Sequence, residues 1–100
     1  MTDEKKQYLE ISNWSAYQDG NNICGWFKLL DDERYQKWSL SIRGVVLGLF
    51  CLQARLNRPM PYDISILSRM MGMSGRMIQD LRRAISILLA DGFLELEGEL

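Results

Sequence analysis

Residues 63–92 decide the fold, and they read DISILSRMMGMSGRMIQDLRRAISILLADG. Apolar residues recur at helical spacing over residues 64–71 and again over residues 75–90, which predicts two amphipathic helices. Gly72-Met73-Ser74 between them is typical of a tight turn, because glycine adopts backbone angles that other residues avoid. Two helices joined by a short glycine-containing turn predict a helix-turn-helix unit.

Polar residues mark the ends of both helices. Asp63 and Ser74 each stand before an apolar repeat, where their side chains are expected to cap the first turn. Asp91-Gly92 ends the second helix. The first helix is expected to point one set of side chains inward and another outward. The inward set is Ile66, Leu67, Met70 and Met71, and the outward set is Ser65, Ser68 and Arg69.

The second helix separates its apolar and polar residues more clearly. At about 100° per residue, its apolar side chains form one stripe and its polar side chains face the opposite way. The apolar stripe contains Met77, Ile78, Leu81, Ile85, Leu88 and Leu89. The polar side contains Arg76, Gln79, Asp80, Arg83 and Ser86, with Arg82 on its flank.

The rest of the chain supplies a buried helix, a short helix and two short strands. Residues 40–57, with Ser39 as N-cap, are apolar around most of the circumference, which predicts a central buried helix. Asp31-Asp32-Glu33 places negative charge at the start of a shorter helix, which carries Tyr35 and ends before Trp38. The candidate strands are Tyr8 to Ile11 and Phe93 to Leu96, followed by a turn at Glu97-Gly98.

Together these elements predict one mostly α domain over residues 1–100, a winged helix-turn-helix with a small β-sheet. A length of 100 residues suits a single core. The wing is expected to be truncated, because the chain ends at Leu100 where a second wing strand would follow. We expect residues 1–5 to be a disordered tail and the turn-rich residues 15–25 to be a loop.

The charge is unevenly distributed along the chain. The net charge is −1, which taken alone argues against a nucleic-acid partner. Residues 1–33 carry −4, residues 34–90 carry +7 and residues 91–100 carry −4. The positive block contains the helix-turn-helix unit, and eight of its nine basic residues are arginine. This pattern favours a nucleic-acid face, and a solvated polar face paired with the acidic ends is the alternative.

The second helix of such a unit usually enters the major groove of DNA with its N-terminal turns nearest the bases. Arg76, Gln79 and Arg83 are expected to face the bases, since arginine pairs bidentately with guanine and glutamine with adenine. The remaining candidates are Ser74 in the turn, and Arg69 and Arg82 as phosphate contacts.

Other classes of function lack the residues that they need. Histidine is absent, which removes imidazole bases and histidine-ligated metals. Cys24 and Cys51 form no CxxC pair, and Cys51 is expected to be a buried free thiol. No nucleophile, base and orienting group assemble, so we expect no enzyme, cofactor, metal or small-molecule substrate. No secretory leader or membrane-spanning run is present, so a cytoplasmic protein without a membrane partner is expected.

A second class of function stays open. Met70, Met71, Met73 and Met77 form a cluster that predicts flexible core packing, with an adaptable protein-binding surface as the alternative. Ile87 falls on the polar side of its helix, where an exposed apolar residue can mark a dimer or partner contact. A homodimer or another protein–protein interaction domain is therefore the alternative to DNA binding.

Several short motifs also carry a family resemblance. They are Tyr8-Leu9-Glu10-Ile11-Ser12-Asn13-Trp14 with Tyr17-Gln18, Trp26-Phe27-Lys28-Leu29-Leu30-Asp31-Asp32, Trp38-Ser39, Arg43-Gly44 and Asp91-Gly92-Phe93-Leu94-Glu95. Over residues 6–96 the chain resembles the N-terminal winged-helix domain of phage and prophage replication proteins. The resemblance implies a replication initiator or replisome organiser that binds DNA, recruits replication-machinery proteins and acts in the host cell cytoplasm.

The chain departs from that family in two places. The family usually has a longer loop before the Asp31-Asp32 pair, and a basic or low-complexity region after the wing. From these departures we expect either a fragment of a longer protein or a short protein that has kept the domain and changed its use.

Overall fold

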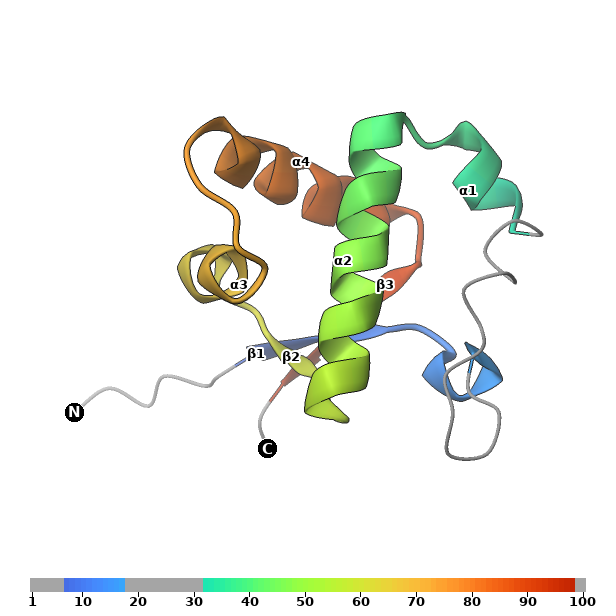
Figure 1. The fold of residues 1–100 in the computed structure, drawn as a ribbon. Coiled ribbons are helices and arrows are strands. Elements are labelled where there is room, and N and C mark those ends of the chain that lie inside the picture. Colours follow the sequence, from blue (N-terminus) through green and yellow to red (C-terminus); the bar gives the residue numbers. More distant parts are fainter. Residues whose placement is uncertain (1–6, 18–31, 99–100) are drawn as a thin grey trace.

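The computed structural model describes residues 7–17 and 32–98 and shows a mostly helical fold with a small antiparallel sheet (Figure 1). In chain order the elements are β1 (Gln7–Ile11), a 3-10 helix (Trp14–Tyr17), α1 (Glu33–Lys37), α2 (Leu40–Leu56), β2 (Met60–Pro61), α3 (Ile64–Met70), α4 (Arg76–Ala90) and β3 (Leu94–Gly98). The prediction of a mostly α fold with a small sheet is confirmed.

The long helix α2 runs through the middle of the molecule, with α1 on one side and α3 on the other, and α4 crosses behind it (Figure 1). The Ser39 hydroxyl caps its start by accepting a hydrogen bond from the Ile42 N–H at 3.3 Å. Asn57 ends it in the left-handed conformation (φ 54°), where its N–H donates to the Gln53 carbonyl. Its buried residues are Val45, Val46, Leu49, Phe50, Leu52 and Gln53.

The sheet has the strand order β2-β1-β3, and the N-terminal strand β1 pairs antiparallel with both neighbours. Leu9 lies opposite Met60 on one side and opposite Leu96 on the other. The Gln53 side chain of α2 extends this pairing, because its Oε1 accepts a hydrogen bond from the Ile11 N–H at 2.9 Å. The strand β2 was not predicted from the sequence.

The two faces of the sheet differ in chemistry. Leu9 and Ile11 are completely buried against the helices. Because side chains alternate across a strand, Glu10 lies on the opposite face, directly across from Glu95 and diagonal to Glu97. This outer face therefore carries three carboxyl groups close together.

Crowding of these carboxyl groups raises the pKa of Glu10 to about 7 from its ordinary 4.5. The largest cause is a side-chain hydrogen bond with Glu97, followed by burial and by the negative charges of Glu97 and Glu95. Near neutral pH a protonated Glu10 therefore donates a hydrogen bond to the Glu97 side chain.

We expect the stability of the domain to fall as pH rises from about 4.5 to about 7. In that range the folded state keeps a proton on Glu10 that the unfolded chain has released. Glu10→Gln removes this dependence, and at pH 8 it should stabilise the domain by about 0.2–1 kcal/mol, the size of a cross-strand charge interaction. Urea denaturation at pH 4 and pH 8 measures both effects. Glu33→Gln on α1 is the control and should keep the wild-type dependence; an equal offset of Glu10→Gln at both pH values would contradict the prediction.

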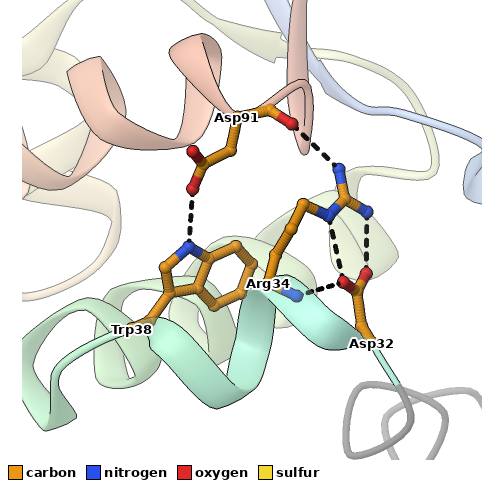
Figure 2. A network of polar contacts seen from close by, with 4 residues as sticks. All are labelled: Asp32, Arg34, Trp38 and Asp91. Carbon is orange, nitrogen blue, oxygen red and sulfur yellow. Dashed lines mark hydrogen bonds and ion pairs between the residues drawn. The ribbon is translucent and has the colours of Figure 1, made fainter.

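A polar network fastens α1 to the end of α4 (Figure 2). The Arg34 guanidinium donates to both carboxylate oxygens of Asp32, at 3.0 and 2.7 Å, and to the Asp91 carbonyl at 3.3 Å. The Trp38 indole N–H donates to the Asp91 carboxylate at 2.8 Å. The hydrogen bonds from Arg34 hold the pKa of Asp32 below its usual range. Asp91 thus joins α1 to the turn before β3.

Four local predictions need correction or lie outside the described residues. Residues 15–17 belong to the 3-10 helix rather than to a loop, and the other residues of the predicted loop lie outside the described ranges, as do tail residues 1–5 and Cys24. Glu97-Gly98 continues β3 and forms no turn. Cys51 is exposed, so its predicted burial was wrong.

The predicted inward and outward faces of α3 were partly wrong. Ser68 is buried, and its hydroxyl donates to the Ser65 carbonyl at 2.9 Å, which satisfies the polar group inside the core. Ile66 and Met70 are exposed, whereas Leu67 is completely buried as predicted. A helix of two turns has a narrow inner face, and here that face centres on Leu67.

Candidate nucleic-acid interface

The helices α3 and α4 are joined by the five residues 71–75, whose backbone needs glycine at two positions. Gly72 has φ 69° and Gly75 has φ 59°, both in the region that residues with a Cβ rarely adopt. Figure 1 shows α3 nearly end-on while α4 lies across the view, so the two helices cross steeply. The turn therefore presents the first residues of α4 at the surface.

The side chains of α4 divide into a buried face and an exposed face. The buried face consists of Leu81, Ala84, Ile85 and Leu88, which pack into the core. Arg76, Gln79 and Arg83 are exposed and follow one another at helical spacing on the opposite side. The structure therefore brings together the three residues that were predicted to face bases.

The other three candidates are exposed at the edges of this face. Arg82 stands about 100° around the helix from Arg83 and so lies on the flank. Arg69 is exposed near the end of α3, and thus belongs to a different helix. Ser74 is exposed in the turn. Its predicted capping role was wrong, because Gly75 is the N-cap residue and no side chain caps α4.

The arginines on α3 and α4 are not neutralised within the described part of the chain. Among residues 7–17 and 32–98 the single ion pair is that of Arg34 with Asp32, at 2.7 Å. Arg69, Arg76, Arg82 and Arg83 make no side-chain hydrogen bond or ion pair with a described residue. Their charge is therefore available to an anionic partner.

Two other arginines of the positive block have structural partners instead. Arg34 is held by Asp32 and by the Asp91 carbonyl, as described above. Arg43 donates to the Tyr35 carbonyl at 3.0 Å and to the Gln36 carbonyl at 3.3 Å, and its guanidinium carbon lies 4.6 Å from the centre of the Tyr35 ring. These two arginines stabilise the position of α1, which the sequence did not indicate.

One acidic side chain, Asp80, borders the arginine face, because it stands four residues after Arg76 and three before Arg83 on α4. Asp63 caps α3 by accepting a hydrogen bond from the Ile66 N–H at 3.1 Å. Asp80 is half-buried beside Ser41 and Val45 of α2, so its carboxylate sits between the buried and exposed faces of α4. The sheet with its glutamates lies at the opposite end of the view in Figure 1 from the first turn of α4. A polyanion can thus approach this turn without meeting the sheet glutamates.

The methionine cluster is only partly a core feature. Met71 and Met73 are partly buried against the core, but Met70 and Met77 are 44% and 50% exposed, so core burial was wrong for these two. Met70 and Met77 line two neighbouring hollows between α2 and the α3–α4 unit. Ile87 packs partly against the core, which gives it a structural role.

The described residues contain no group of three or more metal-ligating side chains that could hold a metal ion. None of the described helices combines the length and the apolar character needed to cross a bilayer.

No protein-family model, curated protein sequence or solved structure matches the chain. The arrangement on α4 is a row of exposed guanidinium groups, without an ion pair to any described residue, and one carboxamide, which is suited to binding phosphates and base edges.

Proposed function

We propose that the chain is a non-enzymatic DNA-binding domain of the winged helix-turn-helix class, with α4 as the helix that enters the major groove. The observation that carries the proposal is the exposed row of Arg76, Gln79 and Arg83, whose guanidinium groups have no partner among the described residues. Arg69 and Arg82 flank this row and are assigned to phosphates. Ser74, in the turn, lies close to where the DNA backbone would pass.

The winged-helix assignment is supported by the placement of the strands. One strand, β2, lies between α2 and α3, and another, β3, follows α4. The strand that joins them is β1, which comes from the N-terminal side of the domain. In this proposal β1 occupies the place of the second wing strand, so the sheet is complete although the wing hairpin is reduced.

The role in phage or prophage replication rests on the resemblance of residues 6–96 to replication initiators and replisome organisers. In that role the domain would recognise a DNA site in the host cytoplasm while other proteins of the replication machinery assemble around it. The exposed arginine row accounts for the DNA contact of such a protein.

We expect the double substitution Arg76→Ala with Arg83→Ala to weaken DNA binding by at least about tenfold, because each good bidentate arginine–guanine pair is worth about 1–3 kcal/mol. An electrophoretic mobility shift of a mixed-sequence duplex at low salt measures the change. The wild-type shift should weaken steeply as salt is raised.

The matched control is Arg55→Ala with Arg58→Ala, which removes the same charge from exposed positions at the end of α2 and just after it. This variant should retain most of the affinity. A wild-type protein that shifts no duplex at low salt would overturn the proposal, and so would an equal loss in both double variants, which would show that net charge alone decides binding.

A protein-interaction domain is the second candidate, and the exposed apolar side chains favour it. Leu40 is 82% exposed, and Met70 and Met77 line the hollows between α2 and the α3–α4 unit. Mass measurement in solution separates the two candidates. A stable dimer without affinity for DNA supports this second function.

A further inference from the structure

The outer edge of β3 carries backbone groups that no described residue uses. The strand lies at one edge of the sheet. The Ser12 N–H donates to the Phe93 carbonyl at 2.8 Å, and along an antiparallel pair the residues alternate between facing the partner strand and facing away. Leu94, Leu96 and Gly98 therefore direct their N–H and C=O groups away from β1. Leu94 is buried, so the accessible part of this edge is formed by Leu96 and Gly98. Such an edge is a template for one more strand.

The side chains of β3 determine which kind of strand would fit. Glu95 and Glu97 are exposed on the outer face of the sheet. Leu96 is on the other face and is 42% exposed. An added strand would place alternate side chains beside the glutamates and the others beside Leu96. Basic side chains suit the first set of positions, and apolar side chains suit the second.

A second copy of β3 does not meet this requirement. If two β3 strands paired antiparallel around a two-fold axis perpendicular to the sheet, Glu95 and Glu97 would face the glutamates of the other copy. Like charges placed opposite each other destabilise strand pairing. Among the described residues the only ion pair lies elsewhere, between Arg34 and Asp32, so no described cation relieves the charge on this face.

We propose that β3 is a docking edge for an extended segment of a partner protein in which basic and apolar residues alternate, bound as a fourth strand of the sheet. This site goes beyond the proposed DNA contact and is separate from it, because the first turn of α4 and the sheet lie at opposite ends of the view in Figure 1. Backbone hydrogen bonds provide the affinity at such an edge, and the alternating side chains provide the specificity.

The test is a titration of the isotope-labelled protein with an end-blocked peptide of alternating lysine and valine, followed by amide NMR at low salt. We expect the largest shifts and slowed amide exchange at the exposed edge residues Leu96 and Gly98. Glu95→Gln with Glu97→Gln should weaken binding about two- to thirtyfold, the size expected for loss of two opposite-charge contacts. Glu33→Gln with Asp80→Asn removes the same charge elsewhere and should bind like the wild type.

Two further peptides separate edge pairing from simple charge attraction. An alternating glutamate–valine peptide should not bind, and a lysine–valine peptide with methylated backbone nitrogens should bind at least about tenfold more weakly, because it lacks the donors that pair with β3. Equal affinity of the methylated and unmethylated peptides would overturn the proposal. Peptide-induced shifts centred on α4 would also overturn it, and so would slow exchange of the β3 amides caused by dimerisation in the absence of peptide. Both glutamine substitutions are on exposed side chains, and an unchanged wild-type spectrum outside β3 verifies the fold.

Discussion

Replacing Phe93 with alanine is expected to lower the free energy of unfolding by about 3–5 kcal/mol, the usual cost of removing a buried aromatic ring. Phe93 is completely buried. Its ring lies edge-on to Trp38, with 5.1 Å between the ring centres, and the Arg34 guanidinium carbon lies 5.4 Å from the centre of the Phe93 ring. The ring therefore supports both the core and the attachment of α1.

Urea denaturation followed by tryptophan fluorescence measures this loss. Small domains are stable by about 5–15 kcal/mol in total, so Phe93→Ala should remove a large share of the stability. Phe93→Leu is the matched control, because it keeps much of the apolar volume and should cost clearly less. A loss below about 1 kcal/mol for Phe93→Ala would contradict the packing described for this residue.

The second large effect is expected at Gln53, a buried polar side chain that is 1% exposed. Gln53→Leu has a similar volume but leaves the Ile11 N–H without the acceptor that it has at 2.9 Å. A buried N–H without a partner costs about 1–3 kcal/mol. We expect a loss of that size in urea denaturation, together with faster hydrogen exchange at the Ile11 amide.

The control for Gln53 is Cys51→Ser on the same helix. Cys51 is exposed, and surface substitutions usually change stability by less than about 0.5 kcal/mol. If the exchange rate of the Ile11 amide stayed unchanged in Gln53→Leu, the hydrogen bond between α2 and β1 would not stabilise the domain.

The helices were largely predictable because their signals are local. The caps at Ser39 and Asp63 and the apolar repeat of α4 placed three helices, α2, α3 and α4, within about one residue of their observed ends. The strand β2 was not predictable in this way. It has two residues, one of them proline, and it is defined by pairing with β1 far away in sequence. Local sequence patterns do not indicate which distant strand a segment will pair with.

The candidate site was predictable in its composition and less so in its details. Spacing alone placed Arg76, Gln79 and Arg83 on the side of α4 away from the core. The linear charge pattern groups Arg34 and Arg43 with the arginines of α3 and α4. In the structure, however, both hold α1 in place through hydrogen bonds. The distinction depends on which carbonyl and carboxylate groups come near each guanidinium in three dimensions, and the linear charge pattern does not contain that information.

The central position of β1 has a consequence for how the chain reaches its native state. Gln7 pairs with Gly98, which is 91 residues further along the sequence. The middle strand β1 therefore cannot complete its pairing until β3 is present. Closing so long a loop is slow and entropically costly, and contacts of this kind lower folding rates. During synthesis β1 leaves the ribosome early, but its pairing with β3 forms only after residues 94–98 have emerged. We therefore expect the pairing of β1 with β3 to be among the last contacts that complete the domain.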